Sequence, residues 1–183
     1  MQRNKGRPPI FEATLDDREV LSKIIRDSFH EVACRFSLTK DNCPKHPSNC
    51  TSSWIESDML RGVRYFILYS DENPIGCVGV EKSGTDVCYL ERLSVLPGMR
   101  GKYYGIRLVQ HALGYAASKG AIRVGIGIID EQTELKEWYR HIGFVETQIK
   151  SFPHLPFTVC LMEFEIKKLP THTVGSDRET GRK

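Results

Sequence analysis

The sequence of 183 residues contains no apolar run near the roughly 18 residues that a membrane-spanning helix requires. Its basic start, MQRNKGRPPIFEATLDD, lacks the apolar core of a signal peptide. It also lacks a block of basic residues, since the net charge is +3 and lysine and arginine alternate with acids. No internal repeat is visible. We therefore expect a cytoplasmic protein with no nucleic-acid partner and no membrane partner.

The chain has six cysteines, but it is larger than the small secreted domains that depend on a disulfide framework. Cys77, Cys88 and Cys160 lie in apolar runs, where a reduced cysteine usually acts as a small buried hydrophobe. We therefore expect reduced thiols at these three positions.

The segment KDNCPKHPSNCTSSW, residues 40–54, contains Cys43, His46 and Cys50. Three interpretations are open: a zinc site, a disulfide between the two cysteines, or a loop whose thiols pack or line a pocket. A structural zinc site has four ligands, and the fourth would have to come from Cys34 or His30 in the preceding helix. The loop interpretation is the preferred one.

The composition, 40% hydrophobic and 27% charged, fits one globular domain with a buried core, which we place at residues 10–168. Residues 1–9 and 169–183 are polar and are expected to be flexible tails. Apolar periodicity, caps and β-rich runs predict the order ααβββαβαββ, a mixed α/β sheet. The predicted helices cover 14–36, 51–60, 105–120 and 131–143, and the predicted strands 64–70, 75–82, 86–97, 121–129, 144–150 and 158–168.

The segment VLPGMRGKYYGIRLV joins a predicted strand to a predicted helix through a short turn rich in glycine and basic residues. Such a turn directs several backbone N–H groups to one spot, in front of the positive end of the helix dipole. It can hold a pyrophosphate, although a tight connection without a ligand gives the same pattern. The spacing fits neither a Walker A loop nor a dinucleotide-binding fingerprint.

The longer stretch YLERLSVLPGMRGKYYGIRLV resembles motif A of the GNAT superfamily of N-acetyltransferases. The segment ELKEWYRHIGF is similar to the motif B helix of that family, in which a tyrosine is followed closely by Gly-Phe. The predicted element order also matches this fold over residues 10–168. The resemblance implies an α/β GNAT fold with a mixed central sheet and an N-acetyltransferase that uses acetyl-CoA as co-substrate.

The resemblance also implies a set of cofactor-binding residues. The backbone of Leu93 and Val95, on a strand splayed from its neighbour, would pair with the pantetheine arm. Gln132 stands where many family members have asparagine, and its amide can still donate a hydrogen bond to that arm. Tyr103 stands at the first family glycine, where a side chain is tolerable if φ stays negative. The amides that would cradle the pyrophosphate belong to Arg100, Gly101, Lys102, Tyr103, Tyr104 and Gly105.

Acetyl transfer to an amine requires help with proton removal, because an amine of pKa ~10.4 is almost fully protonated at pH 7. We expect Glu91 to be the base, directly or through a water; the alternative is a carboxylate paired with Arg92 or another neighbour. We expect Tyr139 to protonate the leaving thiolate; the alternative is a core aromatic beside Trp138. Transfer would be direct, within a ternary complex.

The acceptor is not encoded in any motif, and no metal is expected. In the resemblance family, the loops between the first two helices and between the last two strands choose the acceptor. This implies substrate-binding roles for Cys43, His46 and Cys50 in the first loop and for Phe152 and His154 in the second. Cys50, just before a predicted helix, is expected to have a lowered thiol pKa. A homodimer is possible in this family.

Two rival functions remain. One is a catalytically degenerate module that binds acyl-CoA, which the tyrosine at position 103 suggests. The other is a zinc protein built on Cys43, His46 and Cys50.

Overall fold

The computed structural model describes residues 8–166. Four α-helices are present in that part of the chain: α1 (Arg18–Arg35), α2 (Ser52–Arg61), α3 (Tyr104–Ser118) and α4 (Thr133–Ile142). The strands are β1 (Ile10–Glu12), β2 (Arg64–Ser70), β3 (Asn73–Ser83), β4 (Val87–Val95), β5 (Arg123–Ile129), β6 (Val145–Ser151) and β7 (Thr158–Glu165). Short 3-10 turns lie at η1 (Leu15–Asp17), η2 (Pro47–Asn49) and η3 (Pro97–Met99).

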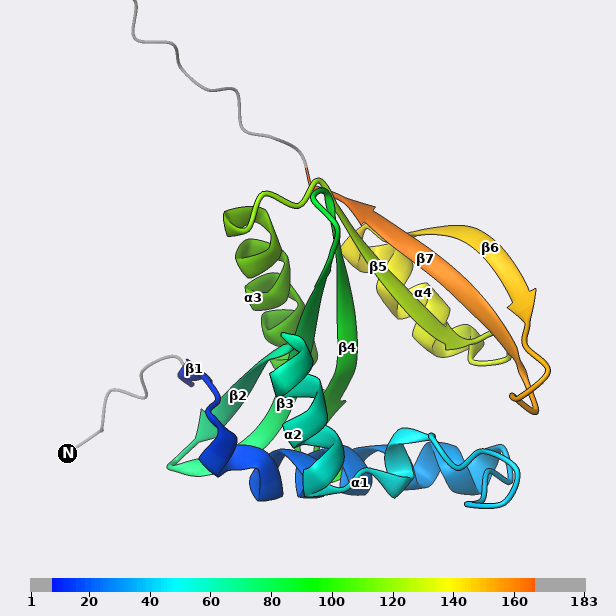
Figure 1. Cartoon of the computed structure of the whole chain (residues 1–183), viewed down its shortest axis with the longest axis horizontal. Coiled ribbons are helices and arrows are strands. Elements are labelled where there is room, and N and C mark those ends of the chain that lie inside the picture. Colours follow the sequence, from blue (N-terminus) through cyan, green and yellow to red (C-terminus); the bar gives the residue numbers. More distant parts are fainter. Residues whose placement is uncertain (1–7, 167–183) are drawn as a thin grey trace, which may run out of the picture.

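The strands form one seven-stranded sheet in the order β1-β2-β3-β4-β5-β7-β6. All neighbours in it are antiparallel except β4 and β5, which are parallel. The mixed α/β sheet predicted from the sequence is therefore confirmed (Figure 1).

The predicted order begins with a helix, whereas the structure begins with the short strand β1. Ile10, Phe11 and Glu12 pair with β2, but three residues are too few to show the alternation that marks a strand in a sequence. Pro8 and Pro9, predicted to belong to a flexible tail, are held: Arg107 donates to the carbonyl of Pro8, and Tyr69 N–H donates to that of Pro9 at 3.0 Å. The rest of the two predicted tails, like residues 167–168, lies outside the described residues.

The helix ends follow the predicted signals. Thr51 caps α2, accepting a hydrogen bond from Trp54 N–H at 3.3 Å. Thr14 and Asp17 form a capping box around η1, so that α1 begins only at Arg18. Gly143, with φ 114°, ends α4 in the left-handed conformation that glycine tolerates.

Alternating side chains of the sheet form two apolar clusters, one on each face. Phe66 and Leu68 of β2 belong to the cluster that packs against α3 and α4. Tyr65 and Ile67 of the same strand belong to the cluster that packs against α1 and α2. The helices therefore cover both faces of the sheet.

No helix within residues 8–166 is long and apolar enough to cross a bilayer.

Candidate active site

The β4–β5 ladder is short, and the two strands separate beyond it. Their parallel pairing covers only the start of each strand, where Tyr89 lies opposite Gly125 in the last matched pair. Figure 1 shows the strands diverging from that end of the sheet. From Leu90 onward β4 therefore has a ladder partner only on its β3 side. This agrees with the splayed strand expected from the sequence.

A β-bulge interrupts the β3–β4 ladder within that open stretch. Glu91 pairs with Gly79 and Ser94 pairs with Cys77, so two residues of β4, Arg92 and Leu93, lie opposite one residue of β3. Arg92 has φ 49°, in the left-handed region. The bulge lets Arg92 face α2, on the same side as Glu91, while Leu93 packs in the α3–α4 cluster.

Glu91 is half-buried on the α2 face of the sheet. Burial raises the pKa of its carboxyl group; the nearby carboxylates of Glu81 and Asp58 raise it further, while the guanidinium groups of Arg92 and Arg61 lower it. Arg92 gives its ion pair to Asp58 and not to the adjacent Glu91. Arg92 and Glu91, both within the described residues, therefore form no ion pair, although the charge of Arg92 still lowers the pKa of Glu91.

The turn before α3 contains two residues with positive φ, Gly101 at 75° and Tyr103 at 62°. The condition of a negative φ, under which a side chain would be tolerable at position 103, is not met, and the Tyr103 side chain is 76% exposed. The first helical hydrogen bond here joins Arg107 N–H to Tyr103 O at 3.2 Å. The N–H groups of Tyr104 and Gly105 therefore have no acceptor within α3, which suits an anion.

The side chain of Arg100 points away from this turn. It donates to the carbonyl of Val95 at 3.2 Å, to the carbonyl of Ser28 at 2.8 Å and to the carboxylate of Glu31 at 2.7 Å. The Arg100 side chain thus links α1 to the end of β4 by hydrogen bonds and an ion pair.

Tyr139 lies in α4 with its ring in the core, 4.9 Å from the ring of Trp138 and 5.2 Å from that of Phe144. Leu93 and Val95 pack on the same cluster. Burial raises the pKa of the Tyr139 hydroxyl, so the group stays protonated at neutral pH and is a weaker acid than an ordinary tyrosine. Gln132 precedes α4, and its side chain makes no capping hydrogen bond.

A profile of the acetyltransferase (GNAT) family matches residues 25–144, which include β4, the turn and α4. The chain belongs to the GNAT family. It is 24% identical over 140 residues to the uncharacterized N-acetyltransferase YjgM of Escherichia coli, and these residues make up 75% of this chain and 81% of that protein.

Solved GNAT structures share the fold. The PaiA N-acetyltransferase of Thermoplasma acidophilum, in complex with coenzyme A, superposes with a TM-score of 0.71 at 15% identity, over 86% of this chain and 99% of that one. A GNAT acetyltransferase of Elizabethkingia anophelis with acetyl-CoA bound gives a TM-score of 0.54 at 14% identity, over 62% and 82% of the two chains. The predicted GNAT fold is confirmed.

In this GNAT chain, the cysteine-containing loop after α1 packs into two different clusters. Cys43 packs with Ala33, Leu38 and Ile129, whereas Cys50 packs with residues of α1 and α2. Burial raises the pKa of Cys50 to about 11, so the prediction of a lowered pKa is wrong. The position before a helix would favour a thiolate, but burial in an apolar cluster disfavours the charge more strongly.

His46 is buried in the same loop. Its ring packs edge to face on Phe29 at 5.8 Å, and Nδ1 lies 2.9 Å from Ser48 Oγ. Burial lowers the pKa of His46. All six cysteines are free thiols, and within residues 8–166 no three His, Cys, Asp or Glu side chains form a group that could hold a metal ion. The structure therefore offers no support for the zinc and disulfide interpretations.

The second predicted acceptor loop, between β6 and β7, lies against the first. Leu155 and Phe157 pack on the cluster that contains Cys43 and Ile129, the last residue of β5. The rings of Phe152 and His154 lie 5.8 Å apart. The structure thus brings together, at the end of β5, the two loops that the sequence implicated in acceptor binding.

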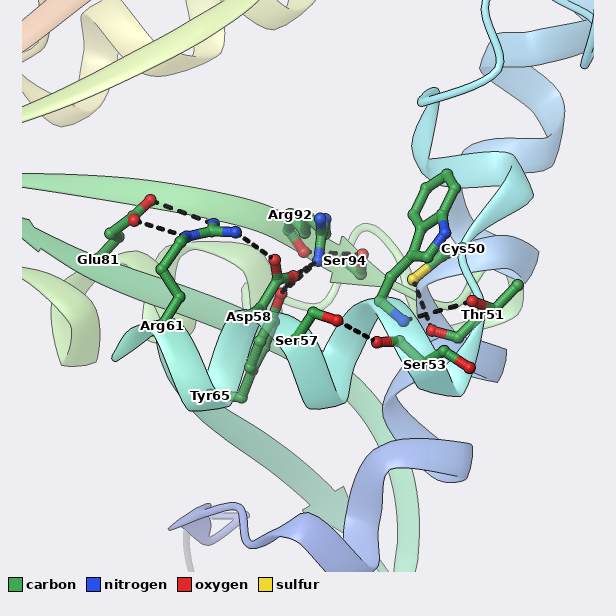
Figure 2. A network of polar contacts seen from close by, with 11 residues as sticks. Cys50, Thr51, Ser53, Ser57, Asp58, Arg61, Tyr65, Glu81, Arg92 and Ser94 are labelled. Atoms are coloured by element: carbon green, nitrogen blue, oxygen red, sulfur yellow. Dashed lines mark hydrogen bonds and ion pairs between the residues drawn. The ribbon is translucent and has the colours of Figure 1, made fainter.

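Figure 2 shows a polar network around Asp58 that no motif in the sequence indicates. Asp58 of α2 pairs with Arg92, accepts a hydrogen bond from Tyr65 Oη at 2.8 Å and accepts another from Arg61 at 2.9 Å. Arg61 also pairs with Glu81 of β3 at 2.9 Å. The one available signal was the spacing of Ile55 and Asp58, which puts a carboxylate on the buried face of α2.

Proposed function

We propose that this GNAT protein is an N-acetyltransferase that moves the acetyl group of acetyl-CoA to a primary amine, of a small molecule or a protein, within a ternary complex. The observation that carries the proposal is the placement of two groups about the open edge of β4. Glu91 lies on the α2 face of that strand, and Tyr139 shares the opposite, α3–α4 cluster with Leu93 and Val95. The proposed base and the proposed acid thus belong to opposite faces of the sheet, on and beside the strand whose edge toward β5 is open.

Acetyl-CoA suits the open edge of β4, where the carbonyl of Val95 already accepts a hydrogen bond from Arg100, and the turn before α3. The edge of Leu93 and Val95 would hold the pantetheine arm by strand-like hydrogen bonds, with the Gln132 side chain as a further donor. The amides of the turn from Arg100 to Gly105, with the positive end of the α3 dipole, would hold the pyrophosphate. Arg100 contributes its amide only, because its side chain is engaged by α1.

The reaction forms one C–N bond and breaks one C–S bond. Glu91, directly or through a water, takes a proton from the acceptor ammonium, so that the neutral nitrogen can attack the thioester carbonyl carbon. The N–H of Leu93 or its neighbour stabilises the negative charge that develops on the carbonyl oxygen. Tyr139 gives its hydroxyl proton to the departing thiolate. The attacking nitrogen, positively charged once it has added to the carbonyl carbon, loses its second proton through solvent to the Tyr139 phenolate, and Glu91 releases the first proton to solvent. The acceptor ammonium thus loses two protons, of which one ends on the coenzyme A thiol and one in solvent.

A thiol-release assay with acetyl-CoA over several amine classes tests this proposal, with Glu91→Gln and Tyr139→Phe assayed beside the wild type. We expect at least one amine class to turn over, with kcat reduced about 100-fold or more in each variant. Glu163→Gln, on an exposed ion pair of β7, is the matched control. Tight binding of acetyl-CoA with no turnover of any amine would instead identify a binding module.

A further inference from the structure

The left-handed backbone of Arg92 needs an explanation, because a residue other than glycine is strained in this region. Such a conformation persists only where the surrounding structure enforces it. Arg92 is held at both ends. Its carbonyl accepts a hydrogen bond from Ser94 Oγ at 2.9 Å, and its guanidinium group binds Asp58 and Tyr65.

The partners of the Arg92 side chain are themselves fixed. The side chains of Asp58 and Arg92 are 5% and 17% exposed, and Tyr65 is fully buried. Both oxygens of Asp58 are engaged, one by Arg61 and the other by Tyr65 and Arg92. Three elements, α2, β2 and β4, therefore converge on one carboxylate (Figure 2).

The ring of Tyr65 reaches Asp58 by crossing strand β3 at a glycine. A Cβ atom at Gly79 would lie 3.0 Å from the Tyr65 ring, and Gly79 is the residue that pairs with both Tyr65 and Glu91. The Tyr65 ring, Gly79 and Glu91 thus form one row across three strands. Asp58 is connected through this row, and through Arg92, to the segment of β4 that carries the proposed base.

We propose that Asp58 is a positioning residue of the transferase, acting through Arg92 to hold the β4 bulge and so to set the places of Glu91 and of the Leu93 amide. This inference rests on the proposed function, because it assigns a catalytic purpose to the bulge. Asp58 itself touches no reacting atom. Its effect on the chemistry is geometric and electrostatic.

The electrostatic part concerns Glu91. The charged groups that act on its carboxyl are Arg92 on β4, Glu81 on β3, and Asp58 and Arg61 on α2. Neutralising Asp58 removes a negative charge that favours the protonated form of Glu91. The acidic limb of the pH profile of kcat/KM should then move to lower pH.

The test compares Asp58→Asn with the wild type in three measurements. We expect kcat to fall about 10- to 100-fold, because small displacements at a reacting centre have effects of that size. The KM for acetyl-CoA should rise by less than kcat falls, because the turn before α3 still holds the pyrophosphate. We expect the acidic limb to shift to lower pH. We also expect faster amide hydrogen exchange in peptides that cover residues 90–95, which is independent of turnover.

Two further variants complete the test. Tyr65→Phe removes one hydroxyl from the network and carries the test if Asp58→Asn does not fold; Glu163→Gln should leave all three readouts unchanged. If the wild type is active and the Asp58→Asn or Tyr65→Phe variant keeps its kcat, its pH profile and its amide hydrogen exchange, this inference alone is overturned. A wild type that transfers acetyl to no amine overturns the proposed function and this inference with it, whatever the exchange shows.

Discussion

At the scale of single residues, the turn before α3 contains two residues with left-handed backbone, of which one is a glycine and the other carries a side chain. Gly101 and Tyr103 both have positive φ, and a Cβ atom at Gly101 would meet no other atom within 4 Å. A substitution at Gly101 therefore tests backbone conformation alone. Tyr103 already has the strained conformation. Replacing it with glycine would relieve strain in the folded state, which stabilises, and would raise the conformational entropy of the unfolded chain, which destabilises.

We predict that Gly101→Ala lowers the free energy of unfolding by about 1–2 kcal/mol, and that Tyr103→Gly changes it by less than about 1 kcal/mol because the two effects oppose each other. Urea denaturation of both variants and the wild type measures this. Acetyl-CoA binding by Tyr103→Gly should match that of the wild type. A large loss of stability in Tyr103→Gly would show that its side chain contributes contacts beyond the backbone.

Glu91 should be unfavourable for stability at neutral pH. Its pKa is raised in the folded protein, so the folded state holds this proton more tightly than the unfolded state. The wild type therefore loses stability as the pH rises from the ordinary pKa of a glutamate through the raised one. Below the ordinary pKa the carboxyl is protonated in both states, and this contribution is constant.

We predict that Glu91→Gln, whose kcat we expect to be reduced, gains stability relative to the wild type as the pH rises from 4 to 7. Denaturant unfolding of the two proteins at several pH values measures the difference, in which the other titrating groups largely cancel. Parallel stability curves would contradict the prediction and would mean that Glu91 has the same pKa in the folded and unfolded states.

At the scale of elements, strand β3 needs a residue without a side chain at position 79, where the Tyr65 ring lies against it. We predict that Gly79→Ala costs about 1–3 kcal/mol, because the added methyl group meets the fully buried Tyr65 ring at 3.0 Å and Val63 at 3.3 Å. Gly114→Ala is the control. A Cβ atom at this position of α3 would meet no atom within 4 Å, and alanine there should raise the free energy of unfolding by about 0.5–1 kcal/mol. Thermal and urea unfolding report both values.

The contrary result for this pair would be equal effects of the two substitutions. That would show that Tyr65 can move aside without loss, and it would weaken the assignment of the Tyr65 row as a rigid connection to Asp58.

Most elements of the fold could be predicted because each has a local signal. The run RYFILYS coincides with β2, and the apolar spacing within residues 105–120 corresponds to α3. The turn before α3 and Tyr139 belong to motifs that are contiguous in the sequence. Strand β1 has no such signal, because it is defined by its pairing with β2 and not by its three residues.

The polar network and the state of Cys50 could not be predicted for a related reason. Asp58, Tyr65 and Arg92 come from three elements, and no spacing in the sequence shows that they meet. The left-handed φ of Arg92 depends on the register of β3 against β4. Burial of Cys50 is likewise a tertiary property, and it outweighs the local effect of the helix start.

At the scale of the whole molecule, the sheet consists of two parts joined by few backbone contacts. Strands β1 to β4 form one part and β5, β7 and β6 the other, and only three pairs of residues connect them in the β4–β5 ladder. A ligand that binds Leu93 and Val95 on one part and Gln132, next to β5, on the other would bridge the two. Such a ligand stabilises the folded state by mass action, because the unfolded chain has no such site.

We predict that acetyl-CoA at about 100 times its Kd adds about 2.7 kcal/mol to the free energy of unfolding and raises Tm by on the order of 5–10 °C. Differential scanning fluorimetry across a concentration series measures the shift. S-acetyl-N-acetylcysteamine, which has the thioester but neither the pyrophosphate nor the adenosine part, is the control and should give little shift, since it cannot engage the turn from Arg100 to Gly105. Equal shifts for the two compounds would contradict a role of that turn in binding, and no shift with acetyl-CoA would contradict the bridging of the two parts of the sheet.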